Sequence, residues 1–196
     1  MMCLGRKLIG ARSLLALDFL TVIDAFTRDI TSIVDQPAAL TVNVRGVAEE
    51  WKPDYAIAHK DGRRDLVMVR TVKWLMKRDP DHGAWMRDLV DAMTQAAKRA
   101  GYGFRLVTEE QIRVQPRLAN AKMLRRHLVP YRSPDGEIAA IDSLADLPKE
   151  SSVAELQARL GERFDAFVLA LQLDWLGHLR IDRRVPFGRM SSFVKT

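Results

Sequence analysis

A succession of short β-prone segments between residues 39 and 72 constrains the fold more than any other feature of the sequence. Residues 61–62 are Asp-Gly, a pair typical of a tight hairpin turn, and the flanking segments are rich in β-branched and aromatic residues. The three segments expected to form strands are Ala39–Val47, Trp51–Lys60 and Arg64–Val72. Together they predict an antiparallel meander.

Helical patterns lie on both sides of this meander. Apolar residues recur at helical spacing from Ala11 to Phe26 and again from Trp85 to Ala100, where Gly101 is placed to end the helix. The segment Tyr102–Thr108 predicts a fourth strand, which we expect to be parallel to the third because a helix crosses over between them. This order predicts an α/β fold with a mixed β-sheet flanked by helices.

The last third of the chain has a different composition. Arg117–Leu128 predicts one more helix, after which Tyr131–Lys149 is rich in Pro, Gly, Ser and Asp and shows little periodicity, so we expect a linker over 131–150. Two amphipathic helical patterns follow from residue 151, and His178–Val194 suggests a short two-stranded wing. Residues 151–196 therefore predict a small helical, winged-helix-like domain.

Charge and cysteine content narrow the possible partners and location. The chain has a net charge of +6 and a pI near 9.7, which favours an anionic partner such as nucleic acid. The single cysteine, Cys3, excludes an internal disulfide framework and a Cys-rich zinc site, so we expect a reducing cytoplasm. No apolar run approaches the roughly 18 residues of a membrane span, and the N-terminus lacks a signal-peptide pattern, so no membrane partner is expected.

The meander carries part of a metal-site pattern. A carboxylate on one strand, followed on the next by an acid or amide two residues before a lysine, is a recurring way to hold Mg²⁺ against DNA. Pro53-Asp54 supplies the first part, but the other two positions fall on Met68 and Arg70. Met68 offers no hard oxygen ligand, and Arg70 stays protonated, although it can bind a phosphate.

Five pieces of sequence occur together in a recognisable order. They are a helix before "QP", "WKPDY", "DG" in the hairpin, "GYGFRLVTEE", and "RLANAKML". From Ser13 to Arg126 this combination resembles the N-terminal domain of the TnsA-type transposase endonucleases, in the restriction-endonuclease-like PD-(D/E)XK superfamily. The resemblance implies a nuclease-like domain over 1–130, duplex DNA as partner, Mg²⁺ as the metal of an active member, and a winged-helix-like C-terminal domain.

The same resemblance implies four active-site positions. Such enzymes use a glutamate from the first helix, the aspartate of the PD strand, and an acid or glutamine plus a lysine from the next strand. Asp54 alone is retained here, while the other positions fall on Ala16, Met68 and Arg70. We therefore expect no metal ligand set and no cofactor. Asp54 is then either a simple hairpin residue or, as we favour, the ion-pair partner of Arg70.

Two basic clusters are candidates for DNA contact. The first lies between Gln111 and Arg132, a segment that contains no acidic residue, and the second lies on the expected wing. Their members are Arg113, Arg117, Lys122, Arg125, Arg126 and Arg132, then Arg180, Arg183, Arg184 and Arg189. The four histidines, including His59, show no metal spacing and are expected at the surface, whereas the four tryptophans are expected in the core or an interface.

Three functions follow from these patterns. The first is a catalytically inactive, nuclease-like subunit of a DNA-bound assembly from a mobile element, a phage or a CRISPR-linked system, with a transposase-like or other protein subunit as a further partner. The second is an active Mg²⁺-dependent endonuclease that cleaves transposon ends. The third is a scaffolding protein whose basic surfaces bind an acidic protein.

Overall fold

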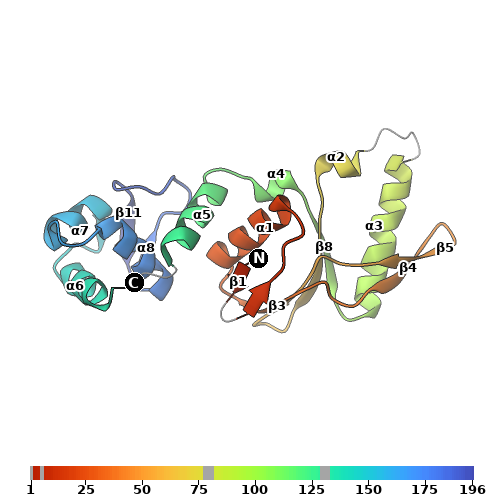
Figure 1. Cartoon of the computed structure of the whole chain (residues 1–196), viewed down its shortest axis with the longest axis horizontal. Coiled ribbons are helices and arrows are strands. Elements are labelled where there is room, and N and C mark those ends of the chain that lie inside the picture. Colours follow the sequence, from red (N-terminus) through yellow and green to blue (C-terminus); the bar gives the residue numbers. More distant parts are fainter. Residues whose placement is uncertain (1, 5–6, 77–81, 129–132) are drawn as a thin grey trace. The chain divides into compact units, whose positions relative to one another are not determined.

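The computed structural model describes residues 2–4, 7–76, 82–128 and 133–196 (Figure 1). The chain divides into two compact units, Met1–Val114 and Gln115–Thr196. The predicted boundary at residue 130 is therefore placed too late, because the helix after residue 115 belongs to the second unit. Each unit is described by itself below.

A mixed four-stranded sheet forms the centre of the first unit. Its strands are β3 (Ile30–Asp35), β6 (Tyr55–His59), β7 (Arg64–Val69) and β8 (Gly103–Val107), in that order across the sheet. The first two pairings are antiparallel and β7 pairs with β8 in parallel. The predicted mixed sheet and parallel last pair are thus confirmed, since helix α3 (His82–Arg99) crosses over between those strands.

The first strand of the meander is not the predicted one. Residues 39–47 do not join the sheet; they divide into β4 (Leu40–Val44) and the start of β5 (Val47–Trp51), which pair with each other in a separate hairpin. Arg45 and Gly46 have φ of 52° and 85°, the left-handed turn that a two-residue hairpin loop requires. The predicted strand Trp51–Lys60 is likewise interrupted, with Pro53 between β5 and β6.

Helices cover both faces of the sheet (Figure 1). Helix α1 (Leu14–Phe26) begins at Ser13, whose hydroxyl accepts a hydrogen bond from the backbone N–H of Ala16, and packs with Val67 and Val69. On the other face, α3 packs with Leu66, Met68 and the β4–β5 hairpin. Alternate residues of β7 therefore enter two different hydrophobic cores, as a strand covered on both faces requires.

Short elements complete the first unit. They are β1 (Met2–Leu4), which pairs with β2 (Lys7–Ile9), α2 (Val72–Leu75) and α4 (Glu109–Ile112). Helix α2 directly follows β7 and is capped by Thr71, while Glu109 accepts a hydrogen bond from the N–H of Val72 over 2.7 Å. The segments after β7 and β8 are thereby joined at one end of the sheet.

The second unit combines four helices with a small sheet. Its elements are α5 (Arg117–Leu128), α6 (Pro134–Ala145), β9 (Glu150–Ser152), α7 (Val153–Leu160), α8 (Ala166–Leu176), β10 (Leu179–Ile181) and β11 (Ser192–Lys195). The sheet has the order β10-β11-β9 and is antiparallel throughout. The predicted linker over 131–150 is wrong where the structure describes it, because Ser133 caps α6 and Pro134 suits its first turn.

A buried asparagine joins α5 to the segment between β10 and β11. Asn120 is 1% exposed; its amide nitrogen donates to the carbonyls of Arg183 and Val185, and its side-chain oxygen accepts from the N–H of Phe187. One side chain thus satisfies three backbone polar groups of this loop, which lies between the strands β10 and β11. Helix α5 is therefore an integral part of the second unit.

Helix α8 is the apolar centre of this unit. Leu169, Ala170, Leu171 and Leu173 are almost fully buried, against α5, α6 and α7. The helix has 11 residues, about half of what a bilayer crossing needs. Across the described parts of the chain, none of the helices has both the length and the apolar character of a membrane span.

Candidate functional site around Asp54 and Arg70

Three of the four positions implied by the nuclease resemblance line one hollow of about 350 Å³. Ala16 comes from α1, Asp54 immediately precedes β6, and Arg70 immediately follows β7. The backbone holds Asp54 in place, because its N–H donates to the carbonyl of Val67 and its own carbonyl accepts from Gln36. Arg12 and Trp74, which sequence reasoning did not select, also line this hollow.

The carboxylate of Asp54 is bound to Arg70, so the predicted ion pair is confirmed. Its Oδ2 accepts hydrogen bonds from Arg70 Nη1 over 2.7 Å and from the N–H of Val69 over 2.8 Å. The same guanidinium nitrogen donates to the carbonyl of Val69, and the Arg70 guanidinium lies 5.4 Å from the centre of the Trp74 ring. Arg70 thus has a fixed position between a carboxylate and an aromatic face.

The residues of this hollow do not fit Mg²⁺. The ion needs several hard oxygen ligands, whereas Ala16 supplies none and Asp54 Oδ2 already accepts a hydrogen bond from the Arg70 guanidinium. Among the described residues, no group of three or more His, Cys, Asp or Glu side chains is arranged to hold a metal ion. With its remaining N–H groups, Arg70 is suited to an anion instead.

Met68 lies apart from the other three positions. Its side chain is 3% exposed and packs in the core on the α3 face of the sheet, although the sequence placed Met68 and Arg70 on one strand face. Strand β7 ends at Val69, so the alternation of side chains between the two faces of the strand does not fix the direction of the Arg70 side chain. Met68 lines a second hollow of about 420 Å³, which shares Arg12, Arg70 and Trp74 with the first.

A buried tyrosine, Tyr55, directly follows Asp54 in the chain. The Tyr55 ring stacks on Phe19 with ring centres 5.8 Å apart, and its hydroxyl donates to the carbonyl of Gly10. Burial, and then the nearby charges of Asp54 and Asp35, raise the pKa of Tyr55 to about 12. The phenol is therefore neutral at physiological pH and acts as a hydrogen-bond donor that fixes the chain before α1.

The first basic cluster differs from the prediction. Arg113 is neutralised by Asp18 of α1, 2.9 Å away, although the two residues are 95 positions apart in the sequence. Arg117, Lys122 and Arg125 each have a partner of their own, while Arg126 is exposed. Arg113 lies in the first unit, and Arg117, Lys122, Arg125 and Arg126 lie in the second. Arg132 lies outside the described residues.

The second cluster is partly structural as well. Arg183 is bound to the buried carboxylate of Asp174, and Arg184 to Asp182 over 3.1 Å. Arg180 and Arg189 are exposed. Exposed cations therefore lie at Arg180 in β10 and at Arg189 in the segment before β11, whereas Arg183 has a role in holding the fold.

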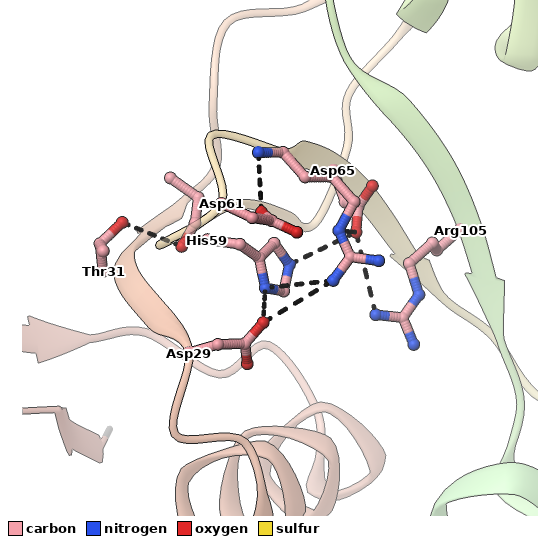
Figure 2. Close-up of polar contacts among 8 residues, drawn as sticks. Asp29, Thr31, His59, Asp61, Asp65 and Arg105 are labelled. Carbon is pink, nitrogen blue, oxygen red and sulfur yellow. Dashed lines mark hydrogen bonds and ion pairs between the residues drawn. The ribbon is translucent and has the colours of Figure 1, made fainter.

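His59 is not the surface residue that the sequence predicted. It is 5% exposed, and Figure 2 shows its ring between Asp29 and Asp65. Its Nδ1 is 2.8 Å from Asp29 Oδ2 and its Nε2 is 3.4 Å from Asp65 Oδ2, while Arg63 and Arg105 lie within 4.0 Å of the Asp65 carboxylate. Because Asp29 and Arg105 lie far from His59 in the sequence, spacing along the chain gave no sign of this cluster.

The bond between His59 and Asp29 predicts a loss of stability in acid. The hydrogen bond from His59 lowers the pKa of Asp29 below its ordinary value of 3.8. A carboxyl with a lowered pKa in the folded state stabilises above its unfolded pKa and loses that contribution as the pH falls through the folded pKa. We therefore expect the stability advantage of the wild type over Asp29→Asn to be complete above about pH 5 and to shrink below about pH 4.

Urea unfolding of both proteins at a series of pH values measures this advantage. Asp61→Asn serves as the matched control, because Asp61 is exposed and the hydrogen bond that it accepts in Figure 2, from the N–H of Arg63, is local. An advantage over Asp29→Asn that stayed constant down to pH 3 would contradict the assignment.

Comparison with known proteins does not assign this chain to a family. No protein-family model matches the sequence, and the curated proteins give no match either. The likeness to TnsA-type endonucleases rests on the order of the motifs, and the function is inferred from the geometry of the hollows.

Proposed function

We propose that this protein is a catalytically inactive, nuclease-like subunit that binds duplex DNA within a larger assembly. The mixed sheet of β3, β6, β7 and β8, covered by α1 on one face and by α3 on the other, supports a restriction-endonuclease-like domain, the fold that the resemblance implies. In the second unit, α6, α7 and α8 with a three-stranded sheet support a winged-helix-like domain. A transposase-like protein is the partner that the resemblance suggests.

The Arg70–Asp54 pair carries the proposal that cleavage has been lost. A guanidinium on the one remaining carboxylate opposes the binding of a metal cation there. Arginine also stays protonated near neutral pH and cannot take a proton from an attacking water. On this proposal the hollow corresponds to the former active site of a nuclease, and Arg70 now makes it suited to an anion.

Phosphate contact is supported by the charge and by the exposed cations. The net charge is +6, and Arg12, Arg126, Arg180 and Arg189 are exposed. Helix α8 is unsuited to reading bases, because its polar side chains Gln172 and Asp174 are buried and it carries no basic residue. Binding through the backbone of DNA, with little sequence preference, is the expected result.

Titration of a fluorescent duplex of about 30 base pairs over a range of salt concentrations tests this function. We expect affinity to fall at least tenfold between roughly 50 and 200 mM salt, because phosphate contacts release counterions. Supercoiled plasmid should stay intact in Mg²⁺ or Mn²⁺. Nicking that disappears in Asp54→Ala would instead favour the active endonuclease, and absence of DNA binding at low salt with a co-purifying acidic protein would favour the scaffold.

A further inference from the structure

We propose that the two adjoining hollows of the first unit bind a nucleoside phosphate, with the base against tryptophans and the phosphate against arginines. This goes beyond duplex binding, since a paired base inside a duplex is stacked on both faces and cannot enter a pocket. The ligand is either a free nucleotide or an unpaired nucleotide of a DNA strand. Both sources present the same planar base and phosphate.

The larger hollow is lined by three of the four tryptophans in the chain. Trp51, Trp74 and Trp85 come from β5, α2 and α3, and Met68 and Met93 contribute apolar surface beside them. Stacking of a base on an aromatic side chain is favourable and tolerates any base, because every base has a planar π-face. Aromatic residues drawn from three elements to one hollow of about 420 Å³ are thus suited to a planar ring.

A buried donor in this hollow has no hydrogen-bond partner. Trp51 is 4% exposed, and its indole Nε1 makes no hydrogen bond within the described structure. A buried N–H without a partner destabilises the folded state, so a ligand acceptor that reached it would be stabilising. Glu49 and Glu50 line the same hollow and offer acceptors for the amino groups of a base. Glu50 also pairs with Lys52 over 3.1 Å.

The smaller hollow has the chemistry of a phosphate site. Arg12 and Arg70 supply two positive charges against the single charge of Asp54, and Thr71 adds a hydroxyl. Arg70 uses Nη1 for Asp54 and Val69, while a guanidinium has five N–H donors in all. The first turn of the 13-residue helix α1 also borders this hollow through Ser13, where the helix dipole favours an anion.

The two hollows adjoin each other through three residues that line both of them. Arg12, Arg70 and Trp74 line both, so a ligand can place its base in the larger hollow and its phosphate in the smaller one without leaving these residues. The Arg70 guanidinium near the Trp74 face adds positive charge where the base and phosphate would join. Inorganic phosphate would contact only the smaller hollow. A nucleoside would contact only the larger one, because it has no negative charge for Arg12 and Arg70 to bind.

Calorimetry and ligand-observed NMR with the full-length protein test the proposal. We expect deoxyadenosine monophosphate to bind at least tenfold more tightly than deoxyadenosine or inorganic phosphate. Trp74→Leu and Arg12→Gln should each weaken binding of the monophosphate at least fivefold. The matched controls are Trp175→Leu and Arg99→Gln, exposed residues outside both hollows, which should leave binding unchanged. Circular dichroism checks that each variant folds.

A second comparison identifies the source of the nucleotide. Blunt duplexes are compared with duplexes that carry a few unpaired nucleotides, and a preference for the overhang that Trp74→Leu abolishes indicates a strand end. Tight binding of the monophosphate without such a preference indicates a free nucleotide. The proposal is overturned if neither ligand binds at millimolar concentration, or if binding survives both variants unchanged. Blunt-duplex binding tests the proposed function separately, so either idea can fail alone.

Discussion

Replacing Arg183 with methionine should lower the free energy of unfolding of the second unit by about 3–5 kcal/mol. Arg183 is bound to Asp174, whose carboxylate is 1% exposed and also accepts from the N–H of Ile181. When the guanidinium is removed, the carboxylate of Asp174 stays buried but loses the positive charge that stabilises it. Solvent cannot compensate, because the side chain has almost no contact with it.

Chemical unfolding of the full-length protein measures this loss. Arg184→Met is the matched control, since Arg184 is 91% exposed and its pair with Asp182 lies at the surface, where solvent screens an ion pair and it contributes little to stability. Adding Asp174→Asn to Arg183→Met should recover part of the stability by removing the buried charge. Equal effects of the two arginine substitutions would show that the Asp174 pair is unimportant.

Replacing Arg70 with methionine should cost about 1.5–3 kcal/mol in the first unit, the range for a hydrogen bond to a charged group. Asp54 would keep its bond from the N–H of Val69 but lose that from Arg70 Nη1. The guanidinium contact with the Trp74 ring would disappear as well. The expected loss is smaller than for Arg183, because Asp54 has more access to water than Asp174.

A double-mutant cycle with Asp54→Asn isolates the coupling between the two side chains. We expect the double variant to be more stable than the sum of the single losses predicts. Lys73→Met is the control, because Lys73 is exposed and lies three residues beyond Arg70. Additive losses would mean that the pair makes no net contribution and that Arg70 is retained for another reason.

The fold was predictable where periodicity is strong. The helices α1, α3 and α5 and the strand β8 follow from apolar spacing and from the glycine at residue 101. Strand β3 was missed because Ile33 is its only fully buried residue, so the edge strand has little alternation. Helix α6 was missed because Ser133 and Pro134, typical of a loop, here begin a helix.

The site was predictable only where contacts follow strand pairing. The Asp54–Arg70 pair joins neighbouring strand ends, so a hairpin register suffices to foresee it. By contrast, Arg113 and Asp18 are 95 residues apart, and the His59 cluster combines three separate segments. Such pairs come together only in the tertiary structure, so the spacing and composition of the sequence do not indicate them. The gathering of Trp51, Trp74 and Trp85 at one hollow belongs to the same class.

The three hydrogen bonds of Asn120 decide where the chain can be divided for experiments. A fragment that starts at residue 131 would leave the carbonyls of Arg183 and Val185 and the N–H of Phe187 without their partner. A fragment that starts at Gln115 keeps α5 and all three bonds. Isolation of the second half for spectroscopy should therefore begin at Gln115, a position that motif boundaries alone would have passed over.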